Sequence, residues 1–183
     1  MRVLRIVVLA LASLGGLALV AIVLFYSAQP ASYRIARTRT IAAPPAAVMA
    51  QLSDVRAFAA WDPWPALPGA PRPTVAFSPE PRGVGAWIVR RDADGSGART
   101  TIASVTAERV EMSNETRGPL GGGSSTQTFE LRAVPAGTEV TWALASDLHG
   151  LARLLWPFVG LEARIAPEME AALSRLDRAC AAP

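Results

Sequence analysis

The sequence predicts an α+β fold in which an antiparallel sheet packs against one long C-terminal helix. From residue 150 to residue 178, apolar side chains recur at helical spacing, with charged side chains between them. The segments before this stretch are short, rich in Val, Ile, Thr, Trp and Phe, and bounded by turn residues, which is typical of strands. A helix with so broad an apolar stripe must bury it, and we expect the strands to provide the surface.

An uncharged segment, residues 6–26, precedes the rest of the chain and predicts a membrane span. At ~1.5 Å rise per residue, its length crosses a ~30 Å hydrocarbon core. A cleaved signal usually has a shorter apolar core, of ~7–15 residues, and a small-x-small cleavage site. Ala28 and Ala31 fail this test because Tyr26 and Gln29 lie two positions before them. We therefore expect an anchor in residues 1–27 and a folded domain in 28–183, with a cleaved signal or a buried soluble helix as alternatives.

The charges around this segment bear on its orientation. Arg2 and Arg5 favour a cytoplasmic N-terminus, whereas Arg34, Arg37 and Arg39 follow the segment. These three are expected in the first strand of a folded domain, and large domains translocate largely regardless of charge. We therefore place the domain on the extracytoplasmic side.

The folded domain is expected to open with a strand and two short helices. Residues 33–41 alternate and are rich in β-formers, which predicts the first strand. Pro44 and Pro45 suit the first turn of a helix that continues to residue 52. Asp54 is placed to cap a second helix over residues 55–60.

Six further strands are predicted after the proline-rich stretch 63–73: residues 74–78, 84–91, 99–106, 109–116, 125–134 and 138–146. The glycine-rich residues 121–125 are expected to form a flexible hairpin loop, and a gating loop at a cavity rim is the alternative. This run lacks the Lys-Ser/Thr of a phosphate-binding loop and leads into a strand, which argues against a nucleotide site. Pro157 and Pro167 predict a lead-in segment through Trp156, followed by a kinked helix over residues 158–179.

Charge and cysteine usage exclude several classes of function. The formal charge is +3 and falls to +1 without Arg2 and Arg5, which is not the footprint of a nucleic-acid-binding protein. Cys180 is the single cysteine and His149 the single histidine, so an intramolecular disulfide is excluded and a transition-metal site is not expected. No cofactor is expected either.

The order of elements resembles the START-like helix-grip superfamily, also called SRPBCC. The nearest branch looks like the polyketide cyclase/dehydrase and lipid transport family, including its membrane-anchored bacterial members. The resemblance covers about residues 33–178 and rests on four stretches of sequence: the segment 41–48, Trp61-Asp-Pro-Trp64, Gly83-Val-Gly85-Ala-Trp87 and Gly137-Thr-Glu-Val-Thr-Trp142.

The resemblance implies a seven-stranded sheet curved around the long helix, with a cavity between them for a hydrophobic small molecule or lipid. Trp61 and Trp64 are candidates for the cavity mouth, although both could simply fill the core. At least one of the strand residues Trp87 and Trp142 is expected to point inward. The remaining candidates for cavity lining are three residues of the final helical stretch, Phe158, Leu161 and Ile165.

The sequence offers three weak candidates for acid/base chemistry: Asp62, His149 and Glu162. A histidine can act as a general base when a carboxylate orients it, and Asp147 lies two residues before His149. Both residues could equally cap the helix that follows.

We expect a membrane-anchored, non-catalytic module that binds a hydrophobic small molecule or lipid. A cyclase/dehydratase-like enzyme acting on a polyketide-like substrate is the first alternative. A ligand-free domain with a filled core that makes protein contacts in the cell envelope is the second.

Overall fold

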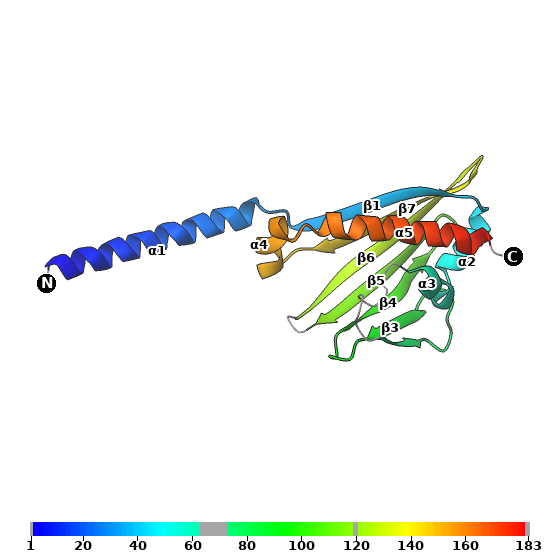
Figure 1. The fold of residues 1–183 in the computed structure, drawn as a ribbon, viewed down its shortest axis with the longest axis horizontal. Helices are drawn as coiled ribbons and strands as arrows, with labels where there is room; N and C mark the ends of the chain where they lie inside the picture. The colour runs from blue at the N-terminus through cyan, green and yellow to red at the C-terminus, as the bar shows by residue number, and fades with distance from the viewer. Residues whose placement is uncertain (1, 63–72, 119–120, 182–183) are drawn as a thin grey trace. The chain divides into compact units, whose positions relative to one another are not determined.

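The computed structural model describes residues 2–62, 73–118 and 121–181. The chain forms two compact units, which are described separately (Figure 1). The larger unit comprises Arg34–Asp147 and the residues from Glu162 onward, and the smaller comprises the residues up to Tyr33 together with Leu148–Leu161.

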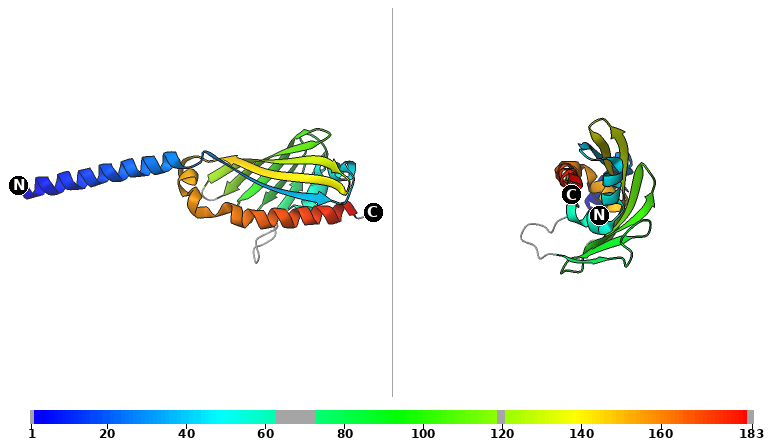
Figure 2. Two further views of the ribbon diagram at one scale, coloured as in Figure 1. Left: turned by 90° about the horizontal axis from the view of Figure 1, so that it is seen from above. Right: turned by 90° about the vertical axis from the view of Figure 1, so that its right-hand side faces the viewer.

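The larger unit is built on a seven-stranded sheet with the strand order β1-β7-β6-β5-β4-β3-β2. All the described pairings from β2 to β7 are antiparallel. The sheet is strongly curved (Figure 2), as the helix-grip fold requires. The strands are β1 (Ser32–Ile41), β2 (Thr74–Phe77), β3 (Trp87–Arg91), β4 (Gly97–Val105), β5 (Arg109–Gly118), β6 (Gly121–Val134) and β7 (Gly137–Asp147).

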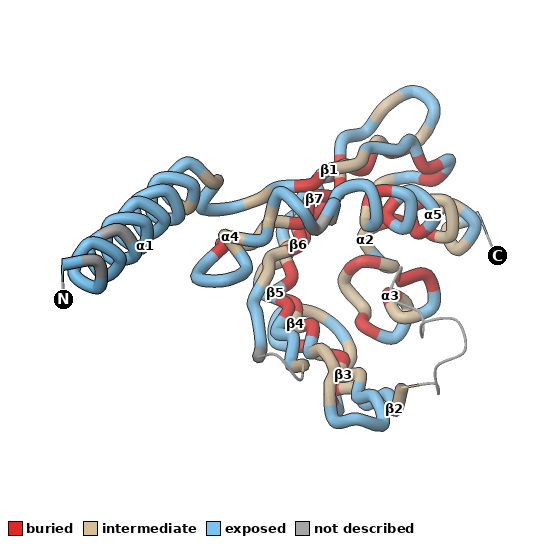
Figure 3. The backbone as a smooth tube through the Cα atoms, turned by 60° about the vertical axis from the view of Figure 1, so that its left-hand side comes forward, coloured by how far each residue is buried: buried red, intermediate tan, exposed pale blue. Residues whose placement is uncertain are grey.

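Alternating side chains give the sheet a buried inner face and an exposed outer face, because successive residues of a strand point to opposite sides. Figure 3 shows this alternation along the strands. Buried inner-face residues include Ile88, Ile102, Met112, Phe129 and Trp142. The core therefore lies between this face and the helices.

Two short helices, α2 (Pro45–Leu52) and α3 (Val55–Trp61), follow the first strand as predicted. Asp54 caps α3, and its carboxylate accepts hydrogen bonds from the backbone N–H groups of Arg56 and Ala57. The same carboxylate pairs with Arg82 at 2.8 Å, which ties the start of α3 to the segment before β3.

The C-terminal helix α5 (Leu161–Ala181) runs beside β1 in Figure 1 and is held there by charged contacts. Arg37 of β1 pairs with Glu162 and Glu170, and Asp177 accepts a 3.0 Å hydrogen bond from the backbone N–H of Ala42. The apolar side of α5 is buried in the core through Ala166, Met169, Ala172, Leu173 and Leu176.

The smaller unit contains the N-terminal helix α1 (Arg2–Ala28) and a short helix, α4 (Gly150–Val159). The large apolar residues described along α1 are exposed, and Figure 3 colours most of this helix as exposed. Leu4–Ala28 is long and apolar enough to cross a membrane, a property shared by spanning helices and signal sequences.

Three expected boundaries were wrong. Residues 121–125 are not a loop but the start of β6, paired with β5 as far as Gly118 and Gly121. Strand β3 begins at Trp87 rather than residue 84, because Gly83 and Gly85 adopt positive φ in a turn. Pro157 lies inside α4, and the helical stretch is interrupted at Gly160, which adopts a left-handed conformation.

Candidate functional site

The inner face of the sheet carries an aromatic cluster beside α3. Phe129 of β6 stacks on its cross-strand partner Trp142 with ring centroids 5.2 Å apart. Trp61 of α3 meets both rings edge-on, at 6.0 and 6.4 Å, and Phe58 packs against Trp61 and Phe129. All four residues are buried. This cluster fills one part of the inner face with rigid apolar surface.

A band of polar side chains continues the same inner face away from the cluster. We call Thr100, Asn114, Ser125 and Gln127 the polar band. Thr100 pairs with Asn114 across β4 and β5, and Asn114 with Ser125 across β5 and β6. Gln127 lies two residues before Phe129 of the aromatic cluster, so the two features adjoin.

Hydrogen bonds link the polar band into a network centred on Asn114. Its Oδ1 accepts from Thr100 Oγ1 at 2.8 Å and from Gln127 Nε2 at 3.0 Å, and its Nδ2 donates to Ser125 Oγ at 3.4 Å. Thr100, Asn114 and Gln127 are buried. Buried polar side chains need such bonds, since each unsatisfied group costs about 1–3 kcal/mol.

Three buried polar atoms at this site have no hydrogen-bond partner within the described part of the chain. They are the acceptor Gln127 Oε1 and the indole N–H donors of Trp61 and Trp142. Gln127 is 1% exposed and Trp142 fully buried. The inner face therefore holds one acceptor and two donors whose hydrogen-bonding capacity is unused within the described residues.

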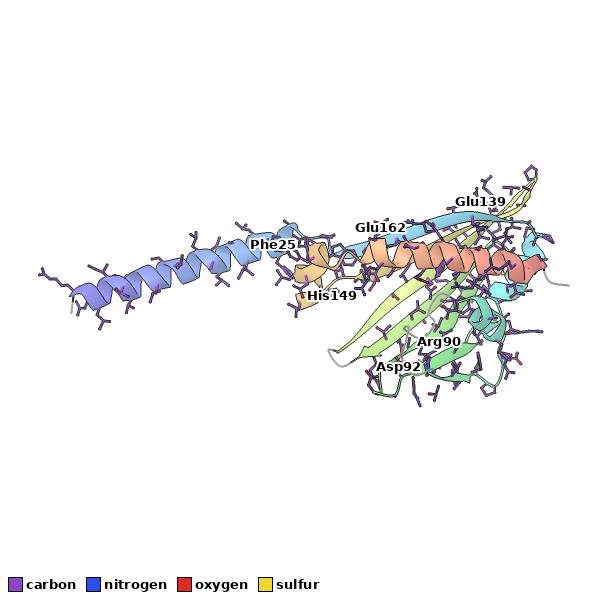
Figure 4. The ribbon with its side chains drawn as sticks, viewed as in Figure 1. Phe25, Arg90, Asp92, Glu139, His149 and Glu162 are labelled. Atoms are coloured by element: carbon purple, nitrogen blue, oxygen red, sulfur yellow. The ribbon has the colours of Figure 1, made fainter. Side chains whose placement is uncertain are left out.

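An ion pair flanks the site at the end of α3. The carboxylate of Asp62 pairs with the guanidinium of Arg90, which lies on the inner face of β3, and the side chains are 2% and 13% exposed. Figure 4 labels Arg90 on its strand. Arg175 of α5 fixes the end of α3 by donating to the carbonyl oxygens of Trp61 at 3.0 Å and Asp62 at 3.3 Å.

The structure brings some of the expected cavity residues together and separates others. Trp61 and Trp142 meet in the aromatic cluster, and Ile165 is half-buried on α5. Trp87 lies on the outer face, where the guanidinium of Arg99 sits 4.7 Å from its ring centroid. Trp64 falls outside the described residues. Phe158 and Leu161 belong to the smaller unit, and Phe158 is 75% exposed.

The three acid/base candidates occupy different environments. Asp62 is buried against Arg90, whereas His149 and Glu162 are exposed. His149 holds the N-cap position of α4 but makes no side-chain capping bond. Glu162 pairs with Arg37 on the surface at 3.3 Å. The part of the chain that the structure describes holds no cluster of three or more His, Cys, Asp or Glu residues suited to a metal ion.

Two surface hollows, of about 680 and 700 Å³, lie over the outer face of the sheet. The first includes the ion pair between the exposed Arg132 and the half-buried Glu139, and the second includes the exposed charges Arg91 and Arg117. Their charged, open linings do not suit an apolar ligand.

The residues of the polar band and Arg90 were missed in the sequence. A signal exists for all of them except Ser125: each lies two positions from an apolar inner-face residue of its own strand, as Thr100 does from Ile102 and Asn114 from Met112. A polar residue in phase with the apolar positions of a strand points into the core.

Comparison with known proteins identifies relatives of this fold. The family model described as polyketide cyclase/dehydrase and lipid transport matches residues 32–181. Among curated proteins, none matches the chain.

Solved structures with the same fold include proteins from two bacteria. One from Rhodobacter sphaeroides is 23% identical with a TM-score of 0.57, covering 84% of this chain and 95% of its own. One from Rhizobium leguminosarum is 20% identical with a TM-score of 0.56, covering 81% and 94%. A protein in the dynemicin biosynthetic locus is 16% identical with a TM-score of 0.54, covering 79% of this chain and 46% of its own.

Proposed function

Because the chain belongs to the polyketide cyclase/dehydrase and lipid transport family, we propose that it is a membrane-anchored module that binds a hydrophobic small molecule or lipid without transforming it. The ligand's apolar body would lie against the aromatic cluster, and its polar group would reach the polar band. The observation that carries this proposal is the set of buried polar atoms without partners, Gln127 Oε1 and the indole N–H groups of Trp61 and Trp142.

The energetics of these atoms favour a bound molecule. A buried acceptor or donor that has lost its water costs about 1–3 kcal/mol. A ligand hydroxyl can donate to Gln127 Oε1, and a ligand oxygen can accept from an indole N–H, which would remove part of that cost. Rigid aromatic side chains beside a few polar groups are typical of small-molecule sites.

Membrane anchoring by residues 6–26 is part of the proposal. The helix Leu4–Ala28 exposes apolar side chains along its length, as a lipid-facing helix does. A bilayer is also a natural source of apolar ligands. As the positive-inside rule suggests, the folded domain would lie on the extracytoplasmic side.

The surroundings of the ionisable candidates support binding over catalysis. The carboxylate of Asp62 is held by the guanidinium of Arg90, and its side chain is 2% exposed. His149 and Glu162 are surface residues.

A cyclase/dehydratase-like enzyme is the second candidate, and the convergence of a buried carboxylate, Asp62, with the half-buried guanidinium of Arg90 is the observation in its favour. An enzyme using Asp62 would keep its ligand but lose all turnover in an Asp62→Asn variant.

A ligand-free domain is the remaining alternative. It is supported by the aromatic cluster, which already fills part of the inner face.

Photolabelling tests the binding proposal. The full chain, reconstituted in vesicles, is irradiated with a long-chain fatty acid that carries a diazirine in its acyl chain, and labelled peptides are mapped. We expect label on β4–β6 in the wild type and in Thr128→Val, whose residue lies on the opposite face of β6. Gln127→Leu should lose that label while α1 stays labelled in all three proteins. Label confined to α1 in the wild type would refute binding of such a ligand at this face.

A further inference from the structure

The short helix α4 of the smaller unit carries an exposed apolar stripe. Leu151, Leu155 and Phe158 are 67%, 45% and 75% exposed. Their spacing of four and then three residues places them on one face of the helix. We call these three residues the α4 stripe. Large apolar side chains grouped in this way mark an interaction surface rather than ordinary exposed residues.

A different face of α4 is attached to the chain segment at the C-terminal end of α1. The guanidinium of Arg153 lies 4.7 Å from the ring centroid of Tyr26 and donates two hydrogen bonds, at 3.0 and 2.6 Å, to the carbonyl oxygen of Gln29. Trp156 stacks on Tyr33 with ring centroids 4.7 Å apart. These contacts hold α4 against the end of α1 and leave the α4 stripe facing outward.

The α4 stripe continues the exposed apolar surface of α1. Phe158 stacks on Phe25, in the last turns of α1, with ring centroids 6.3 Å apart. Figure 4 labels Phe25 at this end of the helix. The single charged side chain of α4 is Arg153, which is used in the attachment, so the stripe contains no charge that would oppose burial in lipid.

We propose that α4 is an interfacial helix whose stripe inserts into the same bilayer that α1 spans. This inference rests on the proposed anchoring by α1, and it adds a second membrane contact in a part of the chain far away in sequence. Helices of this kind bury their apolar face about 5–10 Å into the boundary between headgroups and acyl chains. Tyr26, Tyr33, Trp156 and Arg153 are residue types that favour the same depth, because each joins an apolar body to a polar end.

The bilayer fits the α4 stripe better than a second copy of the chain does. A stripe of three side chains on a ten-residue helix is small for a stable protein interface, which buries about 800 Å² on each partner. The contact between Phe158 and Phe25 also places the stripe beside α1, the helix that is proposed to span the bilayer.

Depth-dependent quenching tests this inference on the full chain in phosphatidylcholine vesicles. In a Cys180→Ser background, a fluorescent thiol label is attached at Leu155→Cys, at Leu14→Cys in α1, or at Glu168→Cys, an exposed site on α5. Each protein is measured with lipids brominated near the headgroup end of the acyl chains, with lipids brominated near the chain ends, and with aqueous iodide.

The result expected is loss of fluorescence at position 155 with shallow bromines and little loss with iodide, whereas position 168 shows the reverse. The label at position 14 should be quenched by one or both sets of brominated lipids. If position 14 is quenched by lipid and position 155 only by iodide, α4 lies in water, and the inference fails while the anchor stands. If position 155 is shielded from both quenchers, a protein covers the stripe and the inference also fails. If the label at position 14 is not quenched by brominated lipid, the anchoring proposal fails, and the inference fails as well because it rests on that anchoring.

Discussion

Asp62 and Arg90 form an ion pair within the core of the larger unit, where their side chains are 2% and 13% exposed. The pair joins the C-terminal end of α3 to the inner face of β3. Removing two charges from water is unfavourable unless each neutralises the other. The pair therefore fixes where the end of α3, with Trp61, sits beside the proposed ligand site.

Breaking this pair should destabilise the protein strongly. We expect Asp62→Ala to lower the free energy of unfolding by about 3–5 kcal/mol, because Arg90 keeps a poorly solvated charge. The double variant Asp62→Ala/Arg90→Met should lose less than the sum of the two single variants. Urea unfolding of the full chain in detergent micelles measures both effects. As a control, Glu111→Ala breaks the more exposed pair with Arg109 and should cost less than about 1 kcal/mol. Equal losses of stability in Asp62→Ala and Glu111→Ala would show that the Asp62–Arg90 pair matters no more than an exposed pair.

Gly137 should tolerate no side chain. It has a φ of 130° at the first residue of β7, directly after the turn from β6, and a Cβ there would collide with the carbonyl oxygen of Ile41. We expect Gly137→Ala to lower the free energy of unfolding by more than the roughly 1–2 kcal/mol that positive φ alone costs a non-glycine residue. Gly95→Ala is the matched control, since Gly95 has a φ of 81° but open space around its Cβ position. Similar losses in thermal unfolding for both variants would show that the contact with Ile41 is unimportant.

The cap of α3 should give the protein an acid-sensitive component of stability. Burial raises the pKa of Asp54, but the hydrogen bond and charge of Arg82 and the backbone N–H bonds from Arg56 and Ala57 together lower it below its ordinary value of 3.8. A lowered folded-state pKa adds stability that is complete above the unfolded-state pKa and is lost as the pH falls through the folded-state pKa.

Asp54→Asn should therefore be less stable than the wild type at about pH 6, and the difference should shrink as the pH falls below about 3.8. Asp54→Ala should cost a further ~1 kcal/mol, because asparagine still caps a helix and alanine does not. Urea midpoints across this pH range provide the measurement. If the stability difference between the wild type and Asp54→Asn grew on acidification, the lowered pKa of Asp54 in the folded protein would be contradicted.

Cys180 should react slowly with alkylating agents. Burial raises the pKa of its thiol, and the negative charge of Asp177 raises it further, so little thiolate is present at neutral pH. We expect Asp177→Asn to speed the reaction with iodoacetamide at fixed pH. Glu170→Gln, which removes a charge farther from Cys180 along the same helix, should leave the rate unchanged. A rate that is unaffected by Asp177→Asn would show that its charge does not control the thiol.

The strand and helix order was predictable from the sequence because it depends on local periodicity and turn residues. Residues 121–125 show the limit of that reasoning. Their composition is typical of a loop, but cross-strand pairing with β5 holds them in the sheet. At position 122 the cross-strand packing itself requires glycine, since a Cβ there would lie 2.7 Å from the carbonyl oxygen of Thr116.

The candidate site was predictable only in part. Trp61 and Trp142 were recognised as aromatic residues beside the second helix and on a strand. Their edge-on contact at 6.4 Å depends on how α3 packs against the sheet, and a single sequence does not specify that packing. The polar band depends on strand register, because Thr100, Asn114 and Ser125 meet only when three strands align.

Native mass spectrometry of the full chain, released from detergent micelles and followed by organic extraction, tests the central claim most directly. Comparison with Gln127→Leu and Thr128→Val separates a ligand on the inner face from lipid around α1. We predict a discrete bound mass in the wild type and in Thr128→Val that is lost in Gln127→Leu. A wild type that carries no discrete mass, or a mass retained equally by all three proteins, would contradict a ligand site at the polar band.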